Sequence, residues 1–127
     1  MASTVGTAVI GVIAVFFLAM GVYALAAPAA LVRSFGMTLG GDASRSEVRA
    51  VYGGFGLAIA AVLAYAAAAD GDLRKGILIT VAAALVGMAV GRVAAAILGD
   101  RTSFYPNWFY FLVEAMAAGA LFAVSAR

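Results

Sequence analysis

The sequence contains no cysteine and no histidine. Without thiols there can be no disulfide, no iron–sulfur ligation and no cysteine nucleophile. Because imidazole and thiolate are the usual ligands of haem, zinc and copper, no metal and no cofactor is expected. Charge is also scarce, since 11% of the residues are charged and the net charge is +2. The basic residues are scattered, so nothing indicates a nucleic-acid-binding surface.

Most of the chain is apolar instead. Apolar residues make up 66% of the 127 residues, and the mean hydropathy is +1.10. Soluble domains carry about 25% charged residues, far more than this chain. A chain of this length cannot hide so much apolar surface behind a water-facing shell. We therefore expect one all-α integral membrane domain over residues 1–127, with the lipid bilayer as its surrounding solvent.

Four apolar segments are long enough to cross a bilayer, since a spanning helix needs about 20 apolar residues. We expect the spans at about residues 5–27, 46–69, 74–98 and 105–126. Pro28 should end or bend the first span, and Gly99 should end the third. The connections after the second and third spans are short, which makes these neighbours antiparallel. The prediction is a four-helix up-down bundle with both termini on one side.

The first span has a rival interpretation as a cleaved signal peptide, because the sequence ALAAPAA offers small residues at a cleavage site. No Lys or Arg precedes the apolar run, and the run exceeds the about 7–15 residues of a signal peptide, so retention is favoured. Abundant Ala and seven Arg among eight basic residues indicate a GC-rich bacterial genome. We therefore expect a multi-pass protein of the bacterial cytoplasmic (inner) membrane. The loop charges are nearly balanced and leave the orientation open.

The stretch Glu47–Gly56, EVRAVYGGFG, stands at the beginning of the second span. Just before it, Ser44 and Glu47 have the S-x-x-E spacing of a capping box. This spacing predicts that the helix begins near Arg45, with Ser44 as its N-cap and Glu47 as the partner of that cap. The glycines at 53, 54 and 56 remove side-chain bulk, which could admit another helix or leave a pocket.

Three charged residues lie inside the predicted spans: Arg49, Arg92 and Glu114. All three fall in the half of the bundle farthest from the termini, which we call the distal half. A charge facing lipid costs about 2.5–3.5 kcal/mol or more, so these side chains should point inward and pair. Residues three or four apart share a helix face. The resulting ligand-binding hypothesis comprises Arg49, Tyr52, Gly53, Arg92, Tyr110 and Glu114, with Asn107 on the same stripe as Tyr110 and Glu114.

This polar cluster has three interpretations. It can be a structural salt-bridge network that fixes helix register. The excess of two Arg over one Glu can instead leave a guanidinium free for a phosphate, a carboxylate or a carbonyl group. Glu114 can also titrate and carry protons.

The first hypothesis on function is a non-enzymatic binder of a lipid or amphipathic small molecule. An accessory subunit, docked on a partner membrane protein or another copy of the chain, belongs to the same hypothesis. The alternative is a small proton-coupled transporter. The second alternative is a lipid-modifying enzyme with Glu47 or Glu114 as acid or base, although no catalytic set is recognisable.

Four sequence elements together resemble a known bacterial family. They are the Pro-containing segment APAALVRSFG, the EVRAVYGG that opens the second span, the pair Gly91-Arg92, and Glu114. The chain is similar over nearly its whole length to a family of small four-helix integral membrane proteins with a domain of unknown function. EVRAVYGG is the most specific part of the resemblance. The resemblance implies four spans and carries no established activity.

Overall fold

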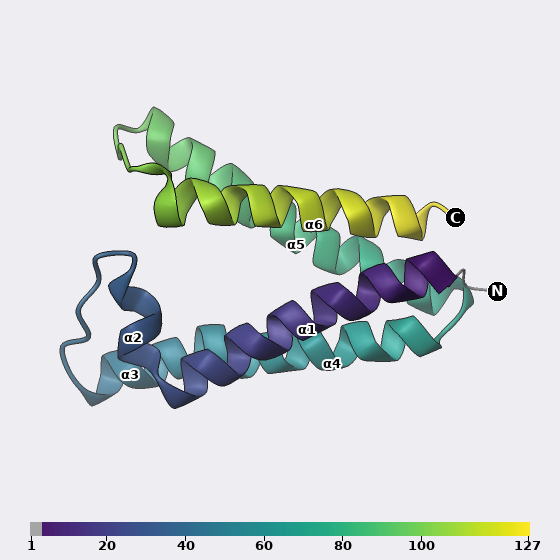
Figure 1. The fold of residues 1–127 in the computed structure, drawn as a ribbon, viewed down its shortest axis with the longest axis horizontal. Coiled ribbons are helices and arrows are strands. Elements are labelled where there is room, and N and C mark those ends of the chain that lie inside the picture. Colours follow the sequence, from purple (N-terminus) through teal and green to yellow (C-terminus); the bar gives the residue numbers. More distant parts are fainter. Residues whose placement is uncertain (1–3) are drawn as a thin grey trace.

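The computed structural model describes residues 4–127, and within them four helical segments are long and apolar enough to cross a membrane. The first is α1 (Thr4–Ala26), which is followed by the short α2 (Pro28–Arg33). The second consists of α3 (Asp42–Val48), the π-helical η1 (Arg49–Gly54) and α4 (Phe55–Ala68). The third is α5 (Gly71–Ile97), and the fourth joins η2 (Phe104–Trp108) to α6 (Phe109–Ser125). The predicted all-α bundle is confirmed, and both termini lie at one end (Figure 1).

Local chemistry explains where these helices begin and end. Pro28 occupies the first turn of α2, where its missing N–H is not needed. Gly99 follows α5 with a φ of 113°, a left-handed conformation that suits glycine. At the other end of the molecule, buried Arg74 donates from Nη1 to the carbonyls of Ala66 at 3.0 Å and Ala67 at 3.3 Å. These carbonyls belong to the last turn of α4, where a helix leaves carbonyls without α-helical partners. The Ala66 carbonyl accepts a second hydrogen bond there, from the Ala69 N–H at 3.2 Å.

The second span begins earlier than the capping-box spacing predicted. Helix α3 starts at Asp42, with Gly41 as its N-cap. The Gly41 N–H donates to Ser44 Oγ at 3.0 Å, and the Ser44 hydroxyl donates to the Gly41 carbonyl at 2.9 Å. Ser44 is therefore the third residue of the helix rather than its N-cap. Glu47 lies exposed one turn later, so the predicted Ser44–Glu47 pairing is replaced by a cap at the glycine turn.

The four spans pack as two pairs, α1 with the second span and α5 with α6. The two pairs meet near the termini and diverge toward the distal end (Figure 1). All four spans contribute to the main core, whose largest fully buried side chains are Ile10, Leu63, Leu78 and Leu121. A smaller cluster at the distal end comprises Ala24, Leu31, Val32 and Val48, all from α1, α2 and α3. The distal half is thus built from two packing units rather than one continuous core.

Glycines allow α1 to cross the second span closely. A Cβ atom on Gly21 would lie 2.9 Å from the backbone nitrogen of Leu57 and 3.0 Å from the carbonyl oxygen of Gly53. A Cβ atom on Gly53 would lie 2.8 Å from the side chain of Leu25, and one on Gly56 would lie 3.3 Å from the Cα of Gly21. Small residues let helix backbones approach in lipid. Gly53 and Gly56 therefore admit a neighbouring helix rather than leave a pocket, the two alternatives that the sequence offered.

Candidate polar site in the distal half

Arg92 of α5 and Glu114 of α6 form a two-pronged ion pair. Arg92 Nε donates to Glu114 Oε1 at 2.9 Å, and Nη2 donates to Oε2 at 2.8 Å. The planar guanidinium matches both carboxylate oxygens, which is the strongest geometry available to such a pair. Glu114 is only 4% exposed. The expectation that these two charges point inward and pair is confirmed.

Two further residues complete the surroundings of Arg92: Asn107, expected on the stripe of Tyr110 and Glu114, and Phe35, which the sequence did not predict. Arg92 Nη1 donates to Asn107 Oδ1 at 3.2 Å. The Arg92 guanidinium carbon also lies 5.9 Å from the ring centroids of both Phe35 and Tyr110, within reach of a cation–π interaction. The seven-residue spacing of Asn107 to Glu114, two helical turns, is what placed Asn107 on this stripe from the sequence. Nothing in the sequence places Phe35 next to α5.

Phe35 links the two helix pairs at their distal ends. It lies in the connection between α2 and α3, and its ring centroid is 5.6 Å from that of Tyr110 on α6. Tyr110 also contacts the rings of Tyr105 and Phe109. The aromatic residues at the beginning of the fourth span therefore surround the outer side of the polar site. The predicted site residue Tyr110 belongs to this arrangement.

Arg49 does not join the ion pair. Its Nε donates to the carbonyl of Leu25 at 2.9 Å. Because Pro28 ends α1, the last carbonyls of that helix lack partners within it, and Arg49 supplies one. Gly53 packs against the same Leu25, so both residues serve the crossing of α1 and η1. Tyr52 is exposed and lies within electrostatic range of Arg92.

The polar site is consequently neutral, with one positive and one negative charge, and the predicted excess of positive charge is not found there. A guanidinium carries five N–H donors, of which three are used by Glu114 and Asn107. The Arg92 side chain is 20% exposed. Among the described residues, no fully buried side-chain nitrogen or oxygen lacks a partner. The two remaining N–H groups of the guanidinium make no hydrogen bond within the described residues.

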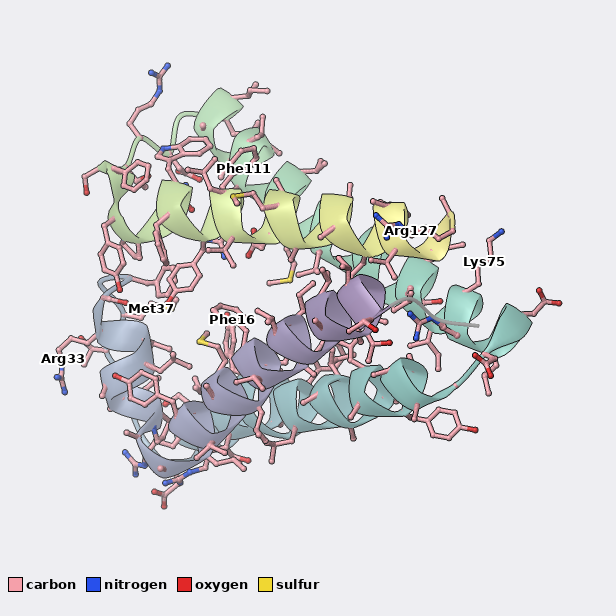
Figure 2. The ribbon with its side chains drawn as sticks, turned by 45° about the vertical axis from the view of Figure 1, so that its right-hand side comes forward. Phe16, Arg33, Met37, Lys75, Phe111 and Arg127 are labelled. Carbon is pink, nitrogen blue, oxygen red and sulfur yellow. The ribbon has the colours of Figure 1, made fainter. Side chains whose placement is uncertain are left out.

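Apolar side chains are also exposed on α1 and along a groove between α5 and α6. Phe16 projects from α1 into the space between α1 and α6 (Figure 2) and is 39% exposed. An open, apolar groove of about 500 Å³ runs between α5 and α6, next to Phe111 and Phe122. The ion pair does not line that groove. The described part of the chain thus offers exposed apolar surfaces in addition to the polar site.

Four helices that are long and apolar enough to cross a membrane, with an ion pair between α5 and α6, define the class as a multi-pass membrane protein with a polar centre in one half of its bundle. The chain belongs to a family described as a domain of unknown function, DUF4345, which matches residues 5–125. The family resemblance seen in the sequence is confirmed. Neither a curated protein nor a solved structure matches the chain.

Proposed function

We propose that this protein binds a lipid or another amphipathic small molecule in its distal half, without catalysing a reaction, in the inner membrane of a bacterium. The observation that carries the proposal is the position of the Arg92–Glu114 pair. It lies in the distal half, where the two helix pairs diverge, and its guanidinium keeps two N–H groups free. Ionisable groups inside a membrane are candidates for function by default.

An amphipathic molecule fits both parts of this region. Its polar end would accept hydrogen bonds from Arg92 and from the amide of Asn107. Its apolar part would lie between α1 and α6, against Phe16 and other exposed apolar side chains. A purely structural pair remains the competing explanation, although buried ion pairs are weak contributors to stability compared with apolar packing.

The other functions fit the contacts less well. Both carboxylate oxygens of Glu114 are held by Arg92, which favours a fixed ion pair over a carboxylate that carries protons. For an enzyme, Glu47 on α3 is exposed and belongs to the other helix pair than Glu114. Neither observation supports a transporter or an enzyme.

Native mass spectrometry of the protein purified in a mild detergent tests the proposal. The informative variant is Arg92→Met/Glu114→Leu, which replaces the pair by apolar side chains of similar size and leaves no charge unpaired. Arg33→Met is the matched control, because Arg33 is exposed at the end of α2 (Figure 2). We expect the wild type and the Arg33 control to retain a lipid that the double variant loses.

Two results would contradict the proposal. The first is a double variant that folds with wild-type helicity and retains the same lipid in the same amount. The second is a wild-type protein that retains no lipid and co-purifies only with a protein partner or a second copy. The second result would indicate that the distal half binds a partner membrane protein or a second copy of the chain.

A further inference from the structure

The hydrogen-bonding groups that Arg92 and Asn107 leave unused are donors. A guanidinium has no acceptor, so the Asn107 atom that faces Arg92 must be its oxygen, and the amide nitrogen with its two N–H groups points elsewhere. Glu114 could accept further hydrogen bonds, but it is 4% exposed and enclosed by the helices. What remains for a ligand is two N–H groups of Arg92 and the amide N–H groups of Asn107.

The charge of the site restricts the ligand further. Glu114 neutralises Arg92 through two short hydrogen bonds, so an anionic headgroup would meet no net positive charge. Such a headgroup would also approach the Glu114 carboxylate, and like charges repel strongly where water is scarce. A cationic headgroup would find no free carboxylate. Donors without net charge suit an uncharged acceptor, and carbonyl oxygen is the common acceptor of uncharged lipids.

We infer that the ligand of the distal half is an uncharged lipid that presents a carbonyl oxygen to Arg92 and Asn107. This inference rests on the proposed function and names its ligand class. Two sources share the chemistry: the ester carbonyl of a diacylglycerol and the ring carbonyl of an isoprenoid quinone. The rings of Phe35 and Tyr110 would supply the aromatic contacts near the acceptor. The exposed Phe16 of α1 would contact the apolar chains of the lipid.

The test is a competition measured by native mass spectrometry in a mild detergent. Delipidated protein is given equimolar diacylglycerol, an isoprenoid naphthoquinone and phosphatidylglycerol, with chains of comparable length. We expect wild type to retain one of the two uncharged lipids at least about tenfold more than phosphatidylglycerol, the scale set by one charge-assisted hydrogen bond. Which uncharged lipid is retained distinguishes the ester from the quinone.

Glu114→Gln is the matched variant, since it keeps the size of the side chain and an acceptor for Arg92 but removes the negative charge. The site then carries a net positive charge, and the retained phosphatidylglycerol should rise by about tenfold or more. Unfolding temperature and helicity verify that this variant is folded. The Arg92→Met/Glu114→Leu variant should bind none of the three lipids above the level of detergent exchange.

The outcomes separate this inference from the function on which it rests. If wild type prefers phosphatidylglycerol, and the double variant loses it, the ligand class is wrong while lipid binding at the pair stands. If Glu114→Gln leaves the preference unchanged, charge neutrality does not select the ligand and the inference is wrong. If wild type retains none of the three lipids, or the double variant retains them all equally, both the inference and the proposed function are wrong.

Discussion

Replacing single glycines of α1 and of the second span by alanine should change the stability of the bundle according to what each new methyl group meets. At Gly21 the added Cβ would lie 2.9 Å from a backbone nitrogen and 3.0 Å from a backbone oxygen of the second span. At Gly11, in the same helix, nothing lies within 4 Å of the added atom. At Gly53 the neighbours at 2.8 Å are the outer atoms of the Leu25 side chain, which is 38% exposed.

These contacts fix the order of the effects. Glycine to alanine in a helix interior stabilises by about 0.5–1 kcal/mol when no contact opposes it, which is the expectation for Gly11→Ala. Backbone atoms cannot yield without separating the helices, so overpacking of about 1–3 kcal/mol outweighs that gain for Gly21→Ala. The Leu25 side chain can turn about 30° away from its rotamer at a cost of about 0.5–1.5 kcal/mol, which leaves the stability of Gly53→Ala near that of wild type.

Reversible unfolding in mixed micelles with a rising fraction of sodium dodecyl sulfate, followed by circular dichroism, measures this order. The midpoint should be highest for Gly11→Ala, near wild type for Gly53→Ala and lowest for Gly21→Ala. Equal midpoints for Gly21→Ala and Gly11→Ala would refute the close crossing of α1 over the second span. A Gly53→Ala variant less stable than Gly21→Ala would refute the distinction between side-chain and backbone neighbours.

Three further predictions use the same unfolding measurement. Glu114→Leu should lower the free energy of unfolding by about 3–5 kcal/mol because it leaves Arg92 buried and unpaired. The double variant Arg92→Met/Glu114→Leu should stay near wild-type stability. Equal losses in the two variants would contradict the paired arrangement. Arg74→Met should lower the free energy of unfolding by about 1–3 kcal/mol, because it removes the hydrogen bonds to the end of α4. The exposed neighbour provides its control, since Lys75→Met should change stability little. Arg49→Met should lower the free energy of unfolding by about 1 kcal/mol and leave the amount of retained lipid unchanged. If the variant loses the lipid, Arg49 contributes to the binding site after all.

The number and approximate limits of the spans could be predicted because they depend on local properties. Length, hydropathy and the breaks at Pro28 and Gly99 are written in the sequence, and each predicted span lies within a few residues of the observed helix. The exception is the beginning of the second span, where two cap arrangements compete. The Ser44–Glu47 spacing suggested one of them, and the folded chain uses the glycine turn instead.

The residue partners could be predicted only in part. Because an unpaired charge in lipid is costly, the sequence predicted that Arg92 and Glu114 would be paired, and they form an ion pair with each other. The same cost applies to Arg49, yet its partner is a backbone carbonyl at the end of α1. The sequence shows that such a charge needs a partner. It does not show which helix end or side chain will lie close enough to be that partner.

The sequence by itself determined four membrane spans, their antiparallel order and the presence of a charged cluster in the distal half. The tertiary structure alone decided that Arg49 leaves this cluster, which makes the site neutral, and that Phe35 enters it. The physical reason is that these helices are apolar on all sides, so no hydrophobic stripe marks the inward face of any of them. The rotation and lateral order of the helices are set instead by contacts such as the glycine crossing, which join residues far apart in the chain.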